Sequence, residues 1–254
     1  MAFDLHTDER LDDLQVNGLQ IIQSEEVFSF SIDAILLARY VSLKRQDRVL
    51  DIGTGNGVIP LLLTTRHTQR RTGEIVALEY QERLAEMARR NVAGNGLDDI
   101  IRVVQGDARQ AVELFGREKF DVVTCNPPYR PAGVGDQSLK EPIKIARHEI
   151  TLTLEQAIAS AASMCRFEGK VAMVHRPDRV AEIFALMRSY RLEPKRMLLV
   201  HPRLDRRPNI VVVEAIKGGR PELKIDPPFV VHNADGSYTQ AMLDIYAGRG
   251  EFAK

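Results

Sequence analysis

The sequence predicts a doubly wound α/β fold, with a Rossmann-like, mostly parallel sheet of seven strands that ends in an antiparallel hairpin. Apolar strand-like segments alternate with helix-like segments between residues 47 and 190, a pattern typical of parallel sheets. The first of these strands runs into a glycine-rich turn. Two later strand-like segments are separated only by the charged loop "RLDRRP". No helix fits between them, so they should pair as an antiparallel hairpin at a sheet edge.

The individual elements are predicted from short apolar runs and from the capping and glycine residues at their ends. Five parallel strands are predicted at residues 47–53, 73–79, 100–107, 120–126 and 169–175, and the hairpin at 197–202 and 209–217. Helices are predicted at residues 58–66, 81–96 and 179–190, with a further helix starting at a capping box, Thr153 to Gln156. Gly96 should end the second of these helices.

Three segments are distinguished along the chain. Residues 1–45 are expected to form an N-terminal cap with a turn and a helix, residues 46–218 a catalytic domain, and residues 219–254 a C-terminal tail packed on the same domain. The tail has a turn at "ADG" and a short amphipathic end. Residues 130–150 form a long loop after the fourth strand, and loops of that length are often functional.

Composition excludes several classes of protein. The chain has 254 residues, 44% of them hydrophobic and 28% charged, which is ordinary for a soluble domain. Its net charge of zero argues against a general nucleic-acid coat. The start lacks a secretory signal, and the longest apolar run is too short to span a membrane. Cys125 and Cys165 lie in apolar surroundings and are predicted to be reduced, which favours a cytoplasmic location.

Local clusters of arginine and lysine interrupt this neutral composition. The clusters are Arg66/Arg70/Arg71, Arg191/Lys195/Arg196 and Arg203/Arg206/Arg207. Each is either a solvated surface or one face of a nucleic-acid site, and the sequence does not decide between them. The histidines outside the strand-end segments have no partners at metal-ligand spacing.

A glycine-rich turn follows the first strand and is a candidate cofactor site. Gly53, Gly55 and Gly57 have the spacing G-x-G-x-G. This spacing differs from the dinucleotide fingerprint, and the turn lacks the GK[ST] of a phosphate loop. Glycines at this position allow a tight turn and let a ligand approach bare backbone.

Polar side chains mark the ends of four successive strands. They are Asp51, Glu79, Asp107 and Asn126. In such sheets, ligands bind outside the carboxyl ends of the strands. A carboxylate at residue 79 can accept from ribose hydroxyls, and one at residue 107 from an adenine amino group. Together with the glycines, these residues predict a nucleoside-type cofactor.

The ordered set "LDIGTGNG", "ALE", "GDA" and "NPPY" resembles the class I S-adenosylmethionine-dependent methyltransferases. The resemblance implies that Gly53, Gly55 and Gly57 wrap the methionine part of S-adenosylmethionine. It implies that Glu79 holds the ribose, and that Asp107 and Ala108 hold the adenine. In one subgroup a "FSxD"-like stretch supports the methionine end, which here would be Phe30, Ser31 and Asp33. Ser31 can equally be an ordinary helix N-cap.

The stretch "NPPY", residues 126–129, suits a nitrogen acceptor of the methyl group. The side-chain oxygen of Asn126 and the carbonyl of Pro127 can accept both N–H bonds of an exocyclic amine, which draws its lone pair out of the ring plane toward the methyl. Tyr129 can stack on the base. Pro127 and Pro128 fix the backbone, so these acceptors are preorganised. Cys125 points to the opposite face of the strand.

Over nearly its full length the chain resembles the bacterial enzymes that methylate N6 of adenine 37, beside the anticodon, in a valine tRNA. The resemblance rests on "ERLDDLQVNGLQIIQSEEVFSFSIDAILLARYV", "CNPPYRPAGVG" and "ARHE", and the tail resembles the Gram-positive branch of this family. It implies a tRNA substrate with a single-stranded or flipped adenine. Arg147, His148 and Arg176 are candidate substrate contacts or solvated loop residues.

Other functions remain open from the sequence. A protein-glutamine N5-methyltransferase of release factors shares "NPPY", but such enzymes usually carry a separate helical domain before the glycine turn. An rRNA or DNA adenine N6-methyltransferase is a further alternative, although no target-recognition domain is evident. A non-catalytic cofactor-binding or RNA-binding module would not need the intact Glu79, Asp107 and Asn126.

Overall fold

The computed structural model describes residues 3–25, 30–66, 73–127, 129, 152–250 and 252. The strands are β1 (Glu9–Asp13), β2 (Gln20–Ser24), β3 (Val49–Ile52), β4 (Ile75–Glu79), β5 (Ile101–Gln105), β6 (Phe120–Cys125), β7 (Cys165–His175), β8 (Leu192–Arg203), β9 (Ile210–Lys217), β10 (Lys224–Ile225) and β11 (Phe229–His232). The helices are α1 (Ile32–Tyr40), α2 (Val58–Thr64), α3 (Glu82–Gly94), α4 (Ala111–Phe115), α6 (Leu154–Met164), α7 (Val180–Ser189) and α8 (Gln240–Tyr246).

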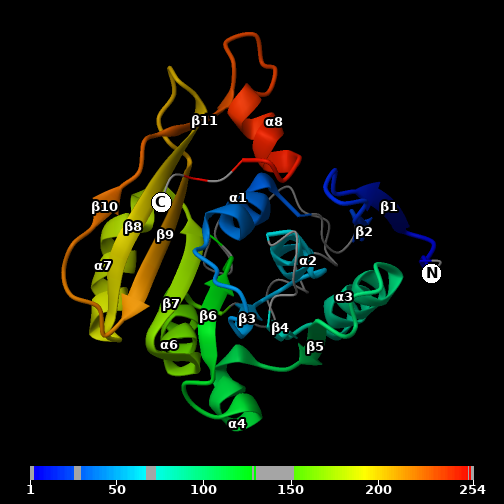
Figure 1. The fold of residues 1–254 in the computed structure, drawn as a ribbon, viewed down its shortest axis with the longest axis horizontal. Coiled ribbons are helices and arrows are strands. Elements are labelled where there is room, and N and C mark those ends of the chain that lie inside the picture. Colours follow the sequence, from blue (N-terminus) through cyan, green and yellow to red (C-terminus); the bar gives the residue numbers. More distant parts are fainter. Residues whose placement is uncertain are drawn as a thin grey trace, which may run out of the picture.

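A mixed sheet of nine strands forms the centre of the fold (Figure 1). Its order is β10-β8-β9-β7-β6-β3-β4-β5, and β11 also pairs with β8. The five strands from β3 to β7 pair in parallel, and β8 and β9 form an antiparallel hairpin, both as predicted. The prediction of seven strands was wrong, because two short strands of the tail add to the sheet.

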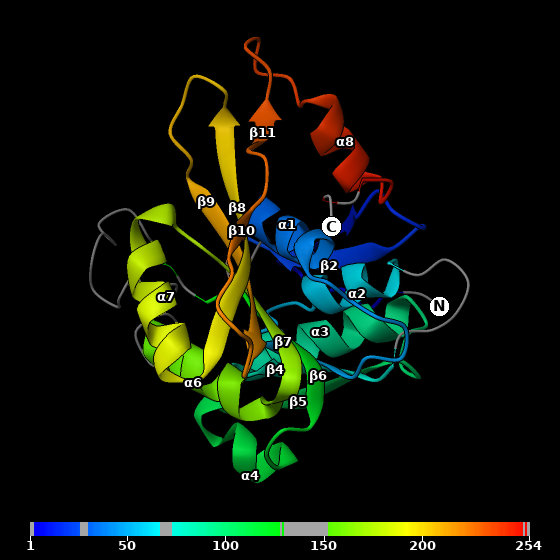
Figure 2. The same cartoon turned by 60° about the vertical axis from the view of Figure 1, so that its left-hand side comes forward.

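Helices cover both faces of this sheet, which explains why its central strands are apolar throughout. Successive side chains of a strand point to opposite faces. In β3, Val49 packs in the cluster that includes α1 and α2, whereas Leu50 packs in the cluster that includes α6. Figure 2 shows α6 and α7 on one side of the sheet and α1 and α2 on the other. The burial of β3 from both sides fixes the strand end from which the glycine turn starts.

The N-terminal segment contains the predicted helix, α1, and a hairpin that the sequence did not predict. Strands β1 and β2 pair in an antiparallel register. Strand β1, "ERLDD", is acidic and lacks an alternating pattern, so its sequence gives no strand signal. The backbone N–H of Ile22 in β2 donates to Oδ1 of Asn91 in α3, over 2.7 Å. This buried bond joins the hairpin to the main body.

The predicted helix signals in the centre of the chain are confirmed. Thr153 is the N-cap of α6, and Thr153 and Gln156 form the reciprocal bonds of a capping box. Gly96 lies just beyond α3 with φ +66°, a conformation that glycine adopts without strain.

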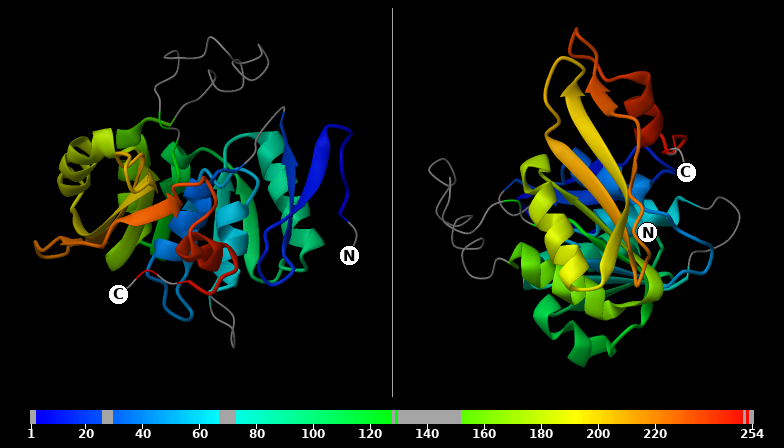
Figure 3. Two further views of the ribbon diagram at one scale, coloured as in Figure 1. Left: turned by 90° about the horizontal axis from the view of Figure 1, so that it is seen from above. Right: turned by 90° about the vertical axis from the view of Figure 1, so that its left-hand side faces the viewer.

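The C-terminal tail lies along the hairpin and against α1 (Figure 3). β10 and β11 both pair with β8 in parallel, so the hairpin is not the free edge that the sequence suggested. The hydroxyl of Tyr40 donates to Oδ2 of Asp226 over 2.6 Å, and Arg196 Nη2 donates to the same oxygen over 2.9 Å. Phe252 packs edge-on against Tyr40, with ring centroids 5.5 Å apart. Asp226 therefore joins the tail to α1 and to β8.

Loss of the Asp226 carboxylate should destabilise the protein. Burial and the bond to Asp226 raise the pKa of Tyr40, so its hydroxyl remains a donor at neutral pH. Asp226→Ala leaves that buried donor without this acceptor and should lower the free energy of unfolding by about 1–3 kcal/mol. Urea denaturation followed by circular dichroism measures the change. Glu222→Ala is the control, because Glu222 is 69% exposed and only 3.8 Å from Lys195; it should shift stability by less than about 0.5 kcal/mol. Equal losses in the two variants would contradict this role of Asp226.

Candidate functional site

The four polar side chains predicted at strand ends do lie at one edge of the sheet. Parallel pairing in the order β6-β3-β4-β5 brings the carboxyl ends of these strands side by side. Asp51 is in register with Thr124, and Glu79 with Gln105. Asp107 and Asn126 follow the ends of β5 and β6. The site is therefore built from residues that are distant in sequence and adjacent only because the sheet is parallel.

The glycine turn joins β3 to α2 through backbone conformations that favour glycine. Gly53, Gly55 and Gly57 have φ values of +69°, +59° and +87°. A Cβ built on Gly53 would meet no atom within 4 Å, whereas on Gly57 it would lie 3.4 Å from Cβ of Ala88. Gly53 therefore borders open space and Gly57 packs on α3.

Glu79 holds this turn in place from the neighbouring strand. Its Oε2 accepts from the backbone N–H of Gly55, and its Oε1 accepts from that of Gln81, both over 2.9 Å. Only 5% of Glu79 is exposed. Burial raises the pKa of this carboxyl, and the backbone donors oppose the rise. Glu79 thus orders both the glycine turn and the start of α3.

Two asparagines that the sequence analysis did not single out complete the support of the turn. Asn56 Nδ2 donates to the carbonyl of Ile22 over 3.0 Å, and Asn91 Nδ2 donates to the carbonyl of Asn56 over 2.9 Å. Both side chains are fully buried. In the sequence, only the asparagine within "GTGNG", Asn56, points to this network. It does not indicate that its partner lies in β2.

Asp51 is a buried carboxyl at the centre of the edge. Its Oδ1 accepts from the hydroxyl of Thr124 over 2.7 Å. Burial raises the pKa of Asp51 to about 7; the Thr124 bond opposes the rise and the charge of Glu79 adds to it. The Thr54 hydroxyl also lies close enough to lower this pKa, although its geometry is outside that of a hydrogen bond. Among the described residues Oδ2 of Asp51 has no hydrogen-bond partner, so it is available to a ligand.

Asp107 and Ala108 lie at the end of β5 in a more open setting. Both oxygens of Asp107 accept from Nε of Arg109 over 2.9 Å. The Arg109 guanidinium holds the pKa of Asp107 below its usual range. The carbonyl of Ala108 accepts from the Ser160 hydroxyl over 2.7 Å. Asp107 is therefore an ionised acceptor, and a carboxylate keeps lone pairs for a further donor after pairing with arginine.

The "NPPY" segment contacts the N-terminal cap. The hydroxyl of Tyr129 lies 2.6 Å from Oδ2 of Asp33 and 3.2 Å from Oδ1 of Asn126. The Ser31 hydroxyl donates to the same Asp33 oxygen over 3.0 Å and caps no helix N–H. The structure therefore brings Ser31 and Asp33 beside Asn126 and Tyr129, and it does not support Ser31 as a side-chain cap of α1. Phe30 is half-buried nearby in sequence, and its N–H donates to Oε1 of Gln23 over 3.0 Å.

His175 is a further residue at this place that sequence reasoning missed. It ends β7, next to β6, and its ring lies 5.1 Å from that of Tyr129. Its Nδ1 accepts from the N–H of Arg176 over 2.8 Å. Burial lowers the pKa of His175, so at neutral pH it is an uncharged imidazole with its proton on Nε2. A histidine at the last position of the fifth strand was the available signal.

The remaining predicted site residues are distributed as follows. Arg176 follows His175, is exposed, and lies 3.5 Å from Asp178. Pro127 is buried directly after Asn126. Pro128, Arg147 and His148 lie outside the described residues. Cys125 is a free, buried thiol in the core, as predicted, and so is Cys165.

The site fits a nucleoside cofactor with a positively charged amino-acid part. Within the described residues, Oδ2 of Asp51, Oγ1 of Thr54 and Oδ1 of Asn56 are buried side-chain oxygens without a hydrogen-bond partner. All three adjoin the open glycine turn. The ionised Asp107 lies two strands away from Asp51 on the same edge. In the same described part of the chain, no group of three or more His, Cys, Asp or Glu side chains is placed to hold a metal.

This fold and this edge of polar strand ends define the class of S-adenosylmethionine-dependent methyltransferases, with S-adenosylmethionine as the cofactor. A family model, the methyltransferase small domain, matches residues 18–188. The chain belongs to this family.

Relatives of known name and structure agree with this assignment. A tRNA1(Val) (adenine(37)-N6)-methyltransferase of Porphyromonas gingivalis is 32% identical over 75% of this chain and 74% of its own length. One of Aeromonas hydrophila is 29% identical over 84% and 86%. A crystal structure of a predicted O-methyltransferase from Agrobacterium tumefaciens has a TM-score of 0.70 and 28% identity, over 87% of this chain and 99% of its own. Membership of a Gram-positive branch stays a prediction.

Cofactor affinity should depend on pH through Asp51. A carboxyl with a raised pKa is mostly protonated below about pH 7, whereas a cation beside it favours the ionised form. Affinity for S-adenosylmethionine should therefore rise by about tenfold between pH 6 and pH 8, with release of a proton. Calorimetry in two buffers of different ionisation enthalpy measures both quantities.

Asp51→Asn should remove this pH dependence. Asp121→Asn is the matched control at the opposite end of β6, where the pKa of Asp121 is lowered and the side chain already ionised at pH 6. A rise in affinity that is equal in wild type and in Asp51→Asn would rule out Asp51 as the titrating group.

Proposed function

We propose that this protein transfers the methyl group of S-adenosylmethionine to the N6 amine of an adenine in tRNA, with position 37 of a valine tRNA as the acceptor. The observation that carries the proposal is the contact between Asn126 and Tyr129 at the end of β6, beside the glycine turn of the neighbouring β3. The names of the relatives in Porphyromonas and Aeromonas support the choice of tRNA and of adenine 37.

Asn126 and Pro127 provide the acceptors that an exocyclic amine requires. The amine lone pair is delocalised into the base, so it is a poor nucleophile. Hydrogen bonds from its two N–H groups to Oδ1 of Asn126 and to the carbonyl of Pro127 turn the lone pair out of the ring plane. The cofactor supplies an electrophilic methyl on a sulfonium. Pro127 is buried, so its carbonyl is fixed before the substrate arrives, which lowers the reorganisation energy of the reaction.

The hydroxyl of Tyr129 has one proton, so it can donate a hydrogen bond to only one of its two neighbours, Asp33 and Asn126. Asp33 lies at 2.6 Å and Asn126 at 3.2 Å. The shorter of the two contacts is the stronger hydrogen bond, so the proton lies toward Asp33. Burial and Asp33 both raise the pKa of Tyr129, so the hydroxyl is protonated at physiological pH. Oδ1 of Asn126 is then available to accept from the substrate amine.

Tyr129 and His175 offer aromatic surface to the base. Their rings are 5.1 Å apart and tilted by 53°. A base that leaves its stack in RNA loses a few kcal/mol, and stacking on an aromatic side chain returns about 1–3 kcal/mol. We propose that a flipped or single-stranded adenine stacks on Tyr129, with His175 supporting that ring from behind.

The same geometry supports a proposed set of cofactor-binding residues. Gly53, Gly55 and Gly57 admit the methionine part, and Asp51 balances its charge. Glu79 accepts from the ribose, and Asp107, with Ala108, from the adenine. Asp33 and Ser31 close the methionine end from the cap, next to Phe30.

The wider organisation follows from the same proposal. Residues 1–45 act as a cap on the cofactor, residues 46–218 as the catalytic unit and residues 219–254 as an accessory tail. In the described part of the chain no helix is long and apolar enough to cross a membrane. Because its proposed substrate is tRNA, we place the protein in the cytoplasm.

Substitution of Asn126 tests the catalytic proposal. Asn126→Ala removes one preorganised acceptor and should lower kcat by about 150-fold, equivalent to about 3 kcal/mol. Binding of S-adenosylhomocysteine, measured by calorimetry, should change less than about threefold. Gly55→Val is the contrasting variant: its φ of +59° excludes a β-branched residue, so cofactor binding itself should be lost. Unchanged turnover in Asn126→Ala would refute the role of this side chain.

The acceptor is identified by methylation of defined substrates with labelled S-adenosylmethionine. A valine tRNA transcript should be methylated, and the same transcript with guanine at position 37 should not. Mass spectrometry of nucleosides should place the added methyl on the base, as N6-methyladenosine, and not on the ribose oxygen that an O-methyltransferase would use. Label that enters only a release factor would overturn the tRNA proposal in favour of a glutamine acceptor.

A further inference from the structure

We propose that the connection between β8 and β9 binds the phosphate backbone of the substrate RNA beside the acceptor site, through Arg203, Arg206 and Arg207. Residues 203–207, which include these three arginines, are called the arginine loop below. The inference rests on the proposed function, because it assumes that the acceptor adenine belongs to RNA. Neither the glycine turn nor "NPPY" predicts where the rest of that RNA lies.

The arginine loop projects from the same edge of the sheet as the acceptor residues. β7 runs parallel to β6, and β9 runs antiparallel to β7, with His175 in register with Val211. Val200, near the end of β8, is in register with Ile210 at the start of β9. The loop therefore leaves the sheet at the edge where β6 ends at Asn126.

The strand order also sets the distance along this edge. β9 and β8 are two and three positions from β6, which corresponds to about 10 and 14 Å at the usual strand spacing. His175 and the exposed Arg176 lie between them, at the end of β7. Figure 2 shows the β8–β9 connection projecting beyond the body of the sheet. An RNA with one adenine at Asn126 can therefore reach the arginine loop with neighbouring nucleotides.

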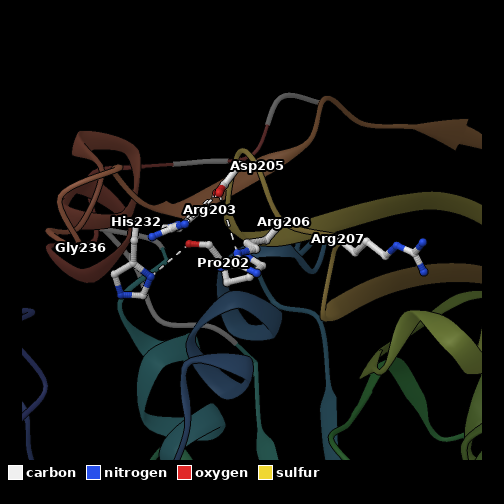
Figure 4. A pocket seen from close by; sticks show the side chains of 7 residues that line it. All are labelled: Pro202, Arg203, Asp205, Arg206, Arg207, His232 and Gly236. Atoms are coloured by element: carbon white, nitrogen blue, oxygen red, sulfur yellow. Dashed lines mark hydrogen bonds and ion pairs between the residues drawn. The ribbon is translucent and has the colours of Figure 1, made fainter.

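The backbone of the loop is held in a defined shape, which fixes where its arginines leave the chain. The N–H of Arg206 donates to the carbonyl of Arg203 over 3.0 Å, and Nδ1 of His201 lies 2.8 Å from the carbonyl of Arg206. The tail supports the same place from outside. His232 of β11 is in register with Arg203, and its Nδ1 lies 3.2 Å from the carbonyl of Pro202 (Figure 4).

A shallow pocket lies between the loop and the tail. It is lined by Pro202, Arg203, Asp205, Arg206, Arg207, His232 and Gly236. Tyr238 stacks on His232 with ring centroids 4.9 Å apart and stays 41% exposed. Proteins that bind single-stranded nucleic acid combine aromatic rings with cations, because bases stack on the rings while phosphates pair with the cations.

The charge of the loop is not neutralised within the described part of the chain. Asp205 is its only acidic residue; it lies 2.8 Å from Arg203 and 3.8 Å from Arg206. The Arg207 side chain makes no hydrogen bond or ion pair with any described residue, and Figure 4 shows it pointing away from His232 and Gly236. Three arginines against one aspartate leave a net charge of +2. At the tip, Leu204 is 80% exposed, so the loop is not packed on the chain's own core.

Most described members of the other two basic clusters are used within the protein, and Arg70 and Arg71 lie outside the described residues. Arg66 Nη1 donates to the carbonyl of Ala38 over 2.8 Å. Arg196 pairs with Asp226, and Lys195 donates to the carbonyl of Arg220. Arg191 precedes β8 and so lies at the opposite edge of the sheet from Asn126. Among the cluster members that the structure describes, Arg206 and Arg207 are therefore the ones both exposed and at the acceptor edge.

The test is the double variant Arg206→Ala/Arg207→Ala, assayed with a valine tRNA transcript. Loss of two phosphate contacts should raise KM for the tRNA by about tenfold at 100 mM salt. It should reduce the slope of log(kcat/KM) against log[salt] by about 1.5. The KM for S-adenosylmethionine and the kcat at saturating tRNA should stay within about twofold of wild type, since neither arginine is placed in the catalytic or cofactor site.

The matched control is Arg45→Ala/Arg117→Ala. These exposed arginines precede β3 and β6, at the amino edge of the sheet, and the variant removes the same charge. KM and salt slope should equal those of wild type. Two results would show that the arginine loop does not bind RNA, while the proposed function stands. In the first, both double variants have the same KM for tRNA and the same salt slope. In the second, Arg206→Ala/Arg207→Ala methylates tRNA with the wild-type slope of log(kcat/KM) against log[salt]. If wild type methylates a release factor and no tRNA, the proposed function fails and this inference fails with it.

Discussion

Parallel pairing of β3 with both β4 and β6 is the constraint on which the site depends. Asp51, Glu79, Asp107 and Asn126 are spread over 76 positions of sequence, yet they share one edge because the strands that carry them run in the same direction. Burial of β3, β4 and β6 from both faces fixes their register, since a slip by one residue would exchange the side chains of the two packed faces. The helices matter to the chemistry mainly because they enforce this register.

The same edge places two carboxyl groups where water is excluded, and this has an energetic consequence. Asp51 and Glu79 are both almost fully buried, and each has a pKa raised by that burial. Glu79 is compensated by the backbone donors of Gly55 and Gln81, whereas Asp51 has one donor, Thr124. Buried charge without compensation costs stability. In the proposed cofactor site, a positively charged ligand in the glycine turn would supply the missing compensation, so the site would favour its cofactor partly because the ligand-free site is unfavourable.

Much of the fold and most of the edge could be predicted from sequence, because their signals are local. Glycine spacing, the capping box at Thr153 and the strand-ending prolines each depend on residues a few positions apart. The hairpin β1–β2, the Asn56–Asn91 network and the place of His175 could not be predicted, because each exists only after distant segments pack. Strands β10 and β11 are short, and they form because β8 offers an unpaired edge. The contact of Asp33 with Tyr129 spans 96 positions and likewise requires the folded sheet.

The tail links the two halves of the proposed substrate site. Through Asp226 it is tied to α1, whose first turn carries Asp33 at the acceptor. Through His232 it is tied to the β8–β9 connection. A chain with no net charge cannot rely on its overall field to attract RNA, so recognition depends on charge placed locally and held rigidly. The tail supplies that rigidity at the loop, while the cap and β6 supply it at the acceptor. Because both are anchored to one sheet, strand order fixes the distance between the proposed phosphate contacts and the proposed position of the reacting amine.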